Sequence, residues 1–448
     1  MDETKNVRDD RLEKLKKIKD LGIDPYPSKL KFDRKLISTA LDSFGSEIAV
    51  AGRLLSLRGH GNVIFADLVD ESGKIQLFFQ KKVLNDQFKI LKLIDIADFI
   101  AVKGKVIKTI VGEISIDISE FQILVKSIKQ LPSMWYGLKD VEERYRKRYL
   151  DIILNNEVKN RLTTRSKIID SIRDFLTNRG FIEVETPTLQ PVYGGGFARP
   201  FSTHHNKLDT DFYLRISDEM YLKRLIIEDI FEYTAKKVLA KTTFEYQGHK
   251  ISLKKPWNRY SLVESIKKFT GVDPLDWSTL EESKKAIIKI GIKEEKKKEL
   301  NKIQTIGECI AFTFEEFVEE KLIQPTIIYD YPIEVSPLAK KCDDLRFTQR
   351  FEFFAFGSEL GNNYTELNDP QDLNKRFIEE KKREKAGFDE AHQTDYDYLE
   401  AIEHGFPPTC GISIGIDRFV MLLTNAKSIK EVIPFPTLRP KEINIMNS

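Results

Sequence analysis

The sequence contains few cysteines and no long apolar run. Its 448 residues include three cysteines, Cys309, Cys342 and Cys410, and they lack the spacing of metal ligands. A sparse, odd count excludes a disulfide framework and favours a reducing cytoplasm. Since no apolar run approaches the length of a membrane span, we expect a cytoplasmic protein without a membrane partner.

The sequence also lacks a charge of one dominant sign. It has 72 Lys and Arg residues against 70 Asp and Glu, which leaves a net charge of +2, so a polyanionic partner would need a local basic surface. The N-terminal stretch MDETKNVRDDRLEKLKKIKDLG lacks the apolar core of a signal peptide. We expect it to form an exposed helix with solvated charges, and a basic arm on nucleic acid is the alternative hypothesis.

Five apolar or alternating stretches between residues 48 and 128 predict short strands, with one helical piece, KKVLNDQFKILKLI, among them. This composition is typical of a small barrel of the oligonucleotide-binding (OB) type. Such barrels stack bases on aromatic side chains and bind the backbone with cations. Candidates for these roles are Phe65, Phe78 and Phe79 with Arg58 and Lys74. The alternative for each phenylalanine is a place in the barrel core.

The second half alternates helices and strands. A helix is predicted from about Val158 to Arg179, ended by Gly180, followed by a strand, FIEVETPTL, that ends at Pro187. Residues 273–303 are rich in Lys and Glu and predict a helical, mobile surface insertion with solvated charges. PTIIYDYP and RFEFFAF predict further strands.

Adjacent histidines stand in the segment GGGFARPFSTHHNKLDTDFYLRISDE, after three glycines that allow close backbone approach to a ligand. His204 and His205 suggest metal ligands. Neighbours on a strand point to opposite faces, however, and no cysteine or second histidine pair lies near. We therefore favour histidines that hydrogen bond or pack.

Two glutamates flank a predicted turn in RFEFFAFGSELGNNYTELND. A tight turn at Ala355–Phe356 would place Glu352 opposite Glu359. Facing carboxylates repel, and a hard divalent ion such as Mg²⁺, bridged to phosphates, would relieve the repulsion. The alternative is two solvated glutamates on a sheet edge. Glu366 adds a third carboxylate that could face a cationic ligand.

The segment PPTCGISIGIDRFVMLL predicts a glycine-containing strand, with Gly411 and Gly415, that leads into a helix. Asp417 and Arg418 stand at the junction. A guanidinium fixed there is well placed for a phosphate chain, because it binds oxyanions in bidentate fashion. Alone, the pattern is weak, because glycine-rich strand ends are common.

With these clusters taken together, the chain resembles the bacterial class II lysine–tRNA ligases over nearly its whole length. VAGRLLSLRG and ADLVDESGKIQLF match in the barrel, and VIPFPTLRP matches near the end. RSKIIDSIRDFLTNRGFIEVETPTL resembles motif 1, the dimer-interface helix and strand, with Pro187 at the family's proline. GISIGIDR resembles motif 3. ARPFSTHHNKLDTDFYLRIS and ELGNNYTELND are the stretches most specific to the lysine enzyme.

The resemblance implies an α+β fold, in which an OB-fold barrel precedes a class II catalytic domain with an antiparallel sheet flanked by helices. The implied segments are a charged helical segment (1–47), an OB-fold anticodon-binding domain (48–130), a linker or interface segment (131–157) and the catalytic domain (158–448), with a helical insertion at about 273–305.

The resemblance also implies a homodimer that attaches lysine to its tRNA through a lysyl-adenylate, with ATP as substrate and Mg²⁺ as cofactor. Arg418 and Gly415 match the ATP site, with Arg418 on the ATP tail, and Glu352 and Glu359 match the pair that holds Mg²⁺. The implied lysine pocket comprises Gly195, Glu219, Asn362, Tyr364 and Glu366, with Glu219 at the α-ammonium. Phe65, Gln76 and Glu113 match residues that contact the anticodon.

One family element is missing. In the family, a segment like YLKRL leads into motif 2, an antiparallel strand pair whose arginine clamps the α-phosphate. Here Ile227 runs directly into Glu228, and the stretch DEMYLKRLIIEDIFEYTAKKVLA has continuous helical spacing across that junction. Loss of the strands would leave neighbouring backbone groups unpaired unless the sheet closes up or a partner fills the gap. Cys410 and Ser413 also stand where motif 3 usually has glycine.

Three hypotheses about function follow. The first is a lysine–tRNA ligase, possessing the pocket acids and Arg418. The second is a catalytically inactive relative that binds tRNA or lysine, favoured by the motif 2 gap, because adenylate formation depends on charge stabilisation at the reacting phosphate. The third is an enzyme that lysylates a protein, and the barrel at 48–128 argues against it.

Overall fold

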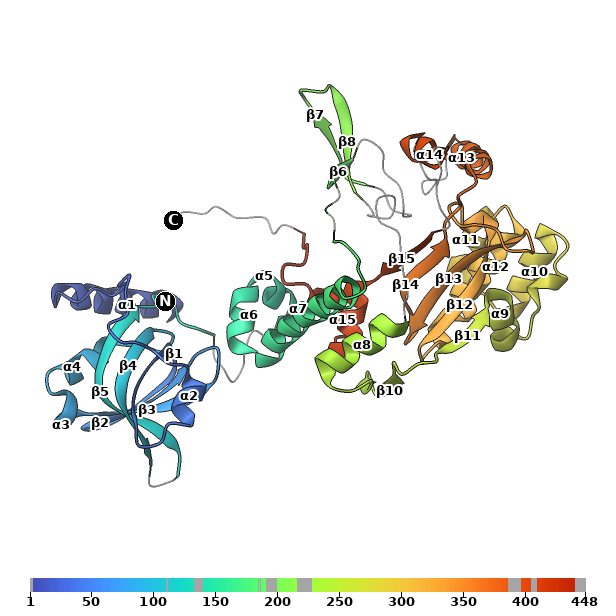
Figure 1. Cartoon of the computed structure of the whole chain (residues 1–448). Helices are drawn as coiled ribbons and strands as arrows, with labels where there is room; N and C mark the ends of the chain where they lie inside the picture. The colour runs from blue at the N-terminus through green and yellow to red at the C-terminus, as the bar shows by residue number, and fades with distance from the viewer. Residues whose placement is uncertain are drawn as a thin grey trace. The chain divides into compact units, whose positions relative to one another are not determined.

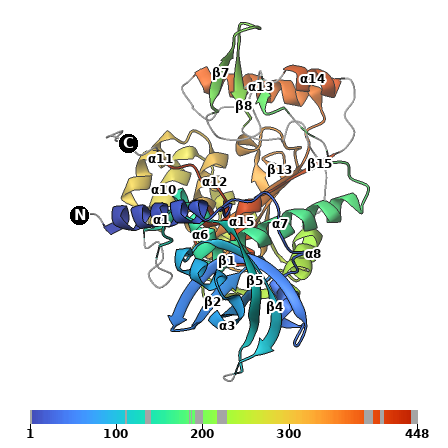
Figure 2. The ribbon, with the colours of Figure 1, turned by 90° about the vertical axis from the view of Figure 1, so that its left-hand side faces the viewer.

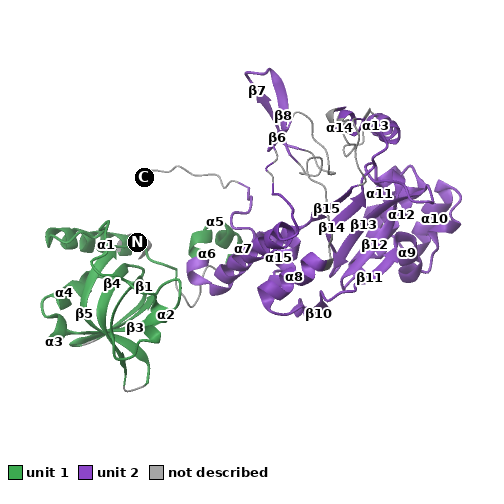
Figure 3. Ribbon diagram, in the orientation of Figure 1, with its two compact units in different colours: residues 1–150 green, residues 151–448 purple. Residues whose placement is uncertain are grey.

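The chain forms two compact units, residues 1–150 and 151–448 (Figure 3). The computed structural model describes residues 3–109, 112–132, 140–183, 185, 187–190, 200–215, 228–385, 396–403 and 409–439. Within that part of the chain, no helix combines the length and the apolar character that crossing a membrane requires.

The first unit is a closed five-stranded barrel, as the sequence predicts. The strands follow the order β1-β2-β3-β5-β4 around it. Their bounds are β1 (Glu47–His60), β2 (Val63–Val69), β3 (Lys74–Gln80), β4 (Phe99–Lys108) and β5 (Ile114–Val125). Alternate apolar side chains point inward and form one core. The predicted turn at 71–73 is present, because the backbone N–H of Asp70 donates to the carbonyl of Gly73 at 3.1 Å.

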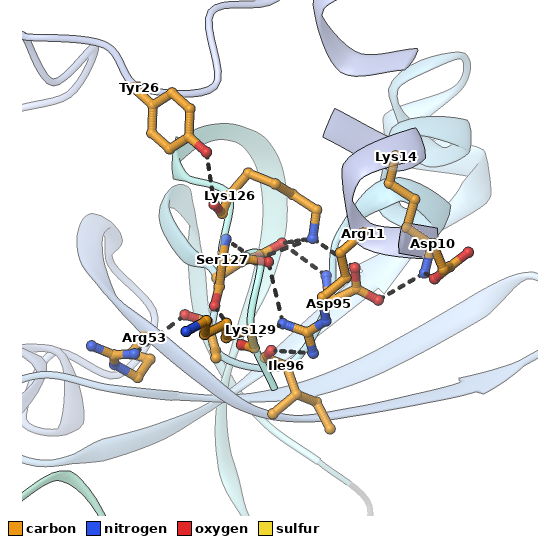
Figure 4. A network of polar contacts seen from close by, with 12 residues as sticks. Asp10, Arg11, Lys14, Tyr26, Arg53, Asp95, Ile96, Lys126, Ser127 and Lys129 are labelled. Carbon is orange, nitrogen blue, oxygen red and sulfur yellow. Dashed lines mark hydrogen bonds and ion pairs between the residues drawn. The ribbon is translucent and has the colours of Figure 1, made fainter. Parts of the chain in front are cut away.

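The N-terminal helix α1 (Glu3–Asp20) packs against the barrel, so the expectation of solvated charges is wrong for Arg11, whereas most other charged side chains of the helix are exposed as expected. Ile18 is fully buried. The Arg11 guanidinium donates to the carbonyls of Ile96, Ser127 and Lys129 at 3.1–3.2 Å (Figure 4). Backbone carbonyls just outside the barrel strands need hydrogen-bond donors. The Arg11 guanidinium supplies them, so this charged side chain stabilises the docking of α1 on the barrel.

A buried ion cluster lies beside this contact. Lys126 has no exposed side-chain surface, and its Nζ lies 2.6 Å from Asp95 and 2.9 Å from Asp98. Lys14 of α1 also pairs with Asp95, at 2.8 Å (Figure 4). Burial raises the pKa of Asp98, although Lys126 and two backbone N–H groups oppose the shift. Burial alone would also raise the pKa of Asp95, but hydrogen bonds and charges from Lys126 and Lys14 outweigh it and lower this pKa.

The second unit is built on a sheet of order β11-β12-β13-β14-β15. Its strands are β11 (Asn258–Ser261), β12 (Thr326–Pro332), β13 (Phe347–Ala355), β14 (Ser358–Thr365) and β15 (Cys410–Ile414). Only the β11–β12 pair is parallel. Among the described residues β15 pairs with β14 alone, so it forms an edge of the sheet.

Helices cover both faces of this sheet (Figures 1 and 2). On one face, apolar side chains of α7 (Asn156–Thr177), α8 (Glu228–Leu239) and α15 (Ile416–Thr424) share a core with Phe353. On the other face, α9 (Leu262–Thr270) and α12 (Ile306–Phe317) share a core with Phe354. Phe353 and Phe354 serve opposite faces because neighbouring strand residues point opposite ways.

Several predicted elements can be compared with the structure. α7 ends close to the predicted position, followed by Gly180 at φ +82°. The predicted strand FIEVETPTL is wrong in its described part, because only β6 (Leu189–Gln190) is extended and paired there. The remaining strands are β7 (Ser202–His205), β8 (Thr210–Leu214), β9 (Thr243–Tyr246) and β10 (His249–Ser252).

The predicted insertion is helical but carries its own small core. α10 (Leu280–Ile290) and α11 (Lys297–Lys302) bury Ile287 and Leu300 against Cys309 and Phe312 of α12. The expected helices are confirmed and most of the charged side chains are exposed as expected, but the segment also buries apolar side chains that the sequence analysis did not predict. Further helices are α2 (Ile37–Leu41), α3 (Lys81–Leu84), α4 (Gln87–Ile90), α5 (Val141–Arg146), α6 (Arg148–Leu154), α13 (Pro370–Lys385), α14 (Tyr396–Glu403) and α16 (Ile429–Val432).

Candidate active site

The β13–β14 hairpin turns one residue later than the sequence predicts. Phe356 and Gly357 occupy the turn with φ values of +53° and +63°, and Ala355 pairs with Ser358. The register then shifts at an extra residue in β14, so Glu352 lies opposite Asn362 rather than Glu359. The predicted direct pairing of the two glutamates is therefore wrong.

The bulge nevertheless leaves both glutamates on one face. Glu359 pairs with Phe354, and Phe354 lies two residues from Glu352 on the same strand. Because directly paired residues share a face and strand residues alternate, Glu352 and Glu359 are diagonal neighbours on that face. Burial, and next the charge of Glu352, raise the pKa of Glu359. The structure thus brings the two carboxylates together by a different route from the one predicted.

The same face carries the candidate lysine pocket on β14. Asn362 pairs with Glu352, and Tyr364 pairs with Arg350, so the four side chains share the face. Glu366 follows two residues further on, is fully buried, and forms an isolated bridge with Ala339. A buried carboxylate at the end of a polar row is suited to a cationic ligand group.

Two residues near Glu352 were missed by the sequence analysis. The Arg350 guanidinium lies 2.5 Å from one Glu352 oxygen, and the Tyr331 hydroxyl donates to the other at 2.8 Å. Arg350 also donates to the carbonyl of Val335 at 2.6 Å. These bonds fix the carboxylate without neutralising Glu359. Arg350 stands two residues before Glu352 on the predicted strand, so strand alternation could have predicted that the two side chains lie on the same face.

Arg418 stands at the first turn of α15, as predicted from motif 3. Its Nη1 donates to the Glu359 carbonyl at 2.6 Å and lies 3.5 Å from the Glu359 carboxylate. About half of its side chain is exposed. It lines a cavity of about 390 Å³ together with Glu359, Gly415 and residues of α7 and β15. Gly415 therefore lies in the same site as Arg418.

The two glutamates fit a magnesium ion only in combination with other ligands. Among the described residues, no group of three or more His, Cys, Asp or Glu side chains could hold a metal. Mg²⁺ commonly takes one or two carboxylates and completes its shell with water and substrate phosphates. Glu352 and Glu359 supply such a pair, and the pKa of Glu319 in the adjacent turn is also raised, by burial and then by these two charges. The local surplus of negative charge is what a divalent ion would relieve.

The paired histidines have ordinary hydrogen-bond partners. His204 Nδ1 lies 2.9 Å from Asp211, and His205 Nδ1 accepts from the backbone N–H of Leu208 at 3.2 Å. The expectation of hydrogen-bonding histidines is confirmed. Gly195 and Glu219, predicted to bind the amino-acid end of lysine, lie outside the described residues, as does Ile227 at the junction with Glu228.

The barrel presents a separate candidate nucleic-acid surface. Phe65 and Phe78 stack with ring centroids 4.9 Å apart, both half-buried, and Arg58 pairs with Phe65 on the next strand. Phe79 is fully buried, so it belongs to the core. In the same region, Gln76 donates to Glu113 at 2.9 Å. The three residues predicted to contact the anticodon, Phe65, Gln76 and Glu113, therefore occur on one part of the barrel, on or beside neighbouring strands.

Comparison with known proteins agrees with both units. A sequence profile described as tRNA synthetases class II (D, K and N) matches residues 140–233 and 225–439. A profile described as OB-fold nucleic acid binding domain matches residues 48–130.

Whole-length relatives give a narrower assignment. The lysine–tRNA ligase of Moorella thermoacetica is 43% identical over 482 residues, covering 96% of this chain and 97% of the relative. That of Thermoanaerobacter pseudethanolicus is 43% identical over 483 residues, covering 96% and 95%. That of Bacillus subtilis is 41% identical over 488 residues, covering 96% and 97%. The chain therefore belongs to the class II tRNA synthetases, within the lysine–tRNA ligase family.

Proposed function

We propose that this chain attaches lysine to tRNA, with ATP and Mg²⁺, through a lysyl-adenylate. The observation that carries the proposal is the polar face of β13 and β14, where Glu352, Asn362, Tyr364 and Glu366 follow one another beside the cavity of Arg418. A candidate site for an amino acid with an ammonium group at each end and a candidate site for a polyphosphate adjoin there, which is the pairing that amino-acid activation requires.

Each residue has a proposed role. Glu366 meets the side-chain ammonium of lysine, since a buried carboxylate gains most from a cationic partner. Asn362 and Tyr364 orient that end of the substrate. The resemblance assigns Glu219 to the α-ammonium and Gly195 to the same end.

At the phosphate end, Arg418 binds the ATP tail beside Gly415. Glu352 and Glu359 would hold Mg²⁺, which supplies neutralisation of phosphate charge when bound. The substrate carboxylate attacks the α-phosphorus, the bond to the bridging oxygen breaks, and pyrophosphate leaves with the electron pair. The chain's own groups hold the reactants in line and stabilise the charge that develops.

The barrel is proposed to bind the tRNA anticodon. Phe65 and Phe78 offer a stacked aromatic surface with a cation, Arg58, on the neighbouring strand, an arrangement suited to unpaired bases. Gln76 and Glu113 supply hydrogen-bonding groups near them. We further propose that the protein is a cytoplasmic homodimer, as the resemblance implies.

Lysine-dependent ATP–pyrophosphate exchange on the purified chain tests the activation step. A rate above a lysine-free blank supports the proposal. The variant Glu366→Gln should lose exchange, because it removes the buried charge that the substrate ammonium meets. A matched control is Glu403→Gln, which alters an exposed carboxylate on α14. A folded wild-type chain without exchange would contradict catalytic competence.

A second candidate function is a non-catalytic protein that binds lysine or tRNA. The class II profile matches in two segments that meet at 225–233, and alignments of 482–488 positions are longer than the 448-residue chain. The alignment lengths imply gaps opposite this chain, and the overlap of the two profile matches supports placing one of them near Ile227 and Glu228, where motif 2 is predicted to be absent. Lysine binding by calorimetry without exchange would favour this candidate, and exchange would exclude it.

A further inference from the structure

The cavity of Arg418 is lined by a second arginine, from a different element. Arg165 of α7 reaches the wall formed by β14, β15 and the first turn of α15. Two carboxylates, Glu359 and Asp417, line the same cavity. Two cations and two anions thus face one space of about 390 Å³, so the charge that a bound ligand meets depends on which of them pair with one another.

The pairing is specific. The Arg165 guanidinium donates to the carboxylate of Asp417. The side chains are only 21% and 33% exposed, which limits screening of this pair by water. Arg418 instead donates to Glu359. Asp417, directly before Arg418 in sequence, would otherwise leave an uncompensated negative charge on the cavity wall.

We infer that Arg165 is a positioning residue that neutralises Asp417 and so allows the cavity to accept the polyphosphate of ATP beside Arg418. The inference rests on the proposed function, which places the ATP tail at Arg418. Without Arg165, the Asp417 carboxylate would repel the phosphates and compete for the Arg418 guanidinium.

A purely structural tie between helices is the competing explanation for Arg165. α7 already has such a tie, because Arg161 lies 2.6 Å from Glu431 of α16. α7 also shares a large apolar core with α8 and α15. Other contacts thus already join these elements, and Arg165, unlike Arg161, lines the cavity.

A double-mutant cycle separates the explanations. We would measure binding of Mg²⁺·ATP to the full chain by calorimetry for the wild type, Arg165→Gln, Asp417→Asn and the double variant, with a thermal melt of each. Arg165→Gln should weaken binding at least about tenfold, because the partly buried carboxylate of Asp417 is left unpaired near the phosphates. Asp417→Asn should bind about as well as wild type, and the double variant should recover to the same level.

Two further variants control for folding and charge. Arg165→Lys keeps the cation and should keep most of the affinity. Arg173→Gln makes the same change on the same helix. Arg173 pairs with Glu183 at 2.9 Å and does not line the cavity, so the affinity for Mg²⁺·ATP should not change.

The outcomes distinguish this inference from the proposed function. A double variant as weak as Arg165→Gln, or an Arg165→Gln variant with unchanged affinity, overturns the inference alone. If the wild type binds Mg²⁺·ATP but shows no lysine-dependent exchange, the proposed catalysis is contradicted, and the double-mutant cycle still decides whether the inference about Arg165 holds. A folded wild type that binds no Mg²⁺·ATP removes both, because no polyphosphate enters the cavity.

Discussion

Replacing Lys126 by methionine removes the cation that Asp98 faces in the barrel unit, while keeping an unbranched side chain of similar length. Lys126 and Asp98 are fully buried, with the Lys126 Nζ 2.9 Å from Asp98. The same Nζ lies 2.6 Å from Asp95 (Figure 4). Asp95 keeps a second cation, Lys14, at 2.8 Å. Asp98 keeps only hydrogen bonds from backbone N–H groups, at 2.7 and 2.8 Å. The variant therefore leaves one buried carboxylate without a counter-charge.

The expected loss of stability is about 3–5 kcal/mol at pH 7, the usual effect of breaking a buried ion pair from one side. The loss should shrink as pH falls. Burial already raises the pKa of Asp98, and Lys126 opposes that shift. Without Lys126 the folded-state pKa rises further above the unfolded value. A raised pKa gives stability that is present at low pH and lost as pH rises through the folded pKa.

Hydrogen exchange of peptides from β4 and β5 in the full chain measures this effect locally. The variant should lose protection there at pH 7 and recover part of it near pH 5, while peptides of the second unit stay unchanged. Lys89→Met is the matched control, because Lys89 pairs with Asp86 at 2.9 Å on the surface, and protection should not change. A loss that is absent at pH 7, or that grows on acidification, would refute the electrostatic reasoning.

Three other substitutions test separate features. Asp70→Asn should destabilise the barrel by about 1–2 kcal/mol by weakening its turn hydrogen bonds. Burial would raise the pKa of Asp70, but hydrogen bonds from Ser72 and from backbone N–H groups lower it. The stability that Asp70 contributes should therefore be lost, in melts at acid pH, as the pH falls through that lowered pKa. Gly361→Ala should disrupt the second unit in a thermal melt, because its Cβ would stand 2.0 Å from the carbonyl oxygen of Ser413. Phe65→Ala should weaken tRNA binding by about 1–3 kcal/mol in a fluorescence titration, without unfolding the barrel, because it removes half of an outward-facing aromatic stack.

Local patterns predicted the elements whose causes are local. The barrel strands follow from apolar alternation, and α7 follows from helical spacing ended by a glycine at φ +82°. Arg418 at a strand–helix junction is also a local feature, and the structure places it as expected. In these cases the residues that determine the conformation are neighbours in sequence.

Features that depend on long-range pairing were not predictable in this way. The hairpin register changed because Phe356 accepts a positive φ and β14 holds one extra residue. The periodicity of apolar residues does not predict where a β-bulge will occur. The docking of α1 depends on Arg11 meeting carbonyls more than 80 residues away, and the Arg165–Asp417 pair joins residues 252 positions apart. Such contacts exist only once the fold does.

The core of the second unit bears on the prediction that motif 2 is missing. Phe231 of α8 lies within 4.2 Å of Phe419 and 5.4 Å of Phe353, measured between ring centroids. α8 begins at Glu228, directly after the predicted junction, and is nevertheless buried against α7 and α15. The described residues on both sides of the predicted junction therefore share one apolar core. Among the described residues β15 pairs with β14 alone, and Ser413 is exposed on it beside the cavity of Arg418. An unpaired edge costs less than an open core, because water satisfies its backbone groups. We therefore expect a folded chain whose deficit, if exchange is absent, lies in phosphate chemistry.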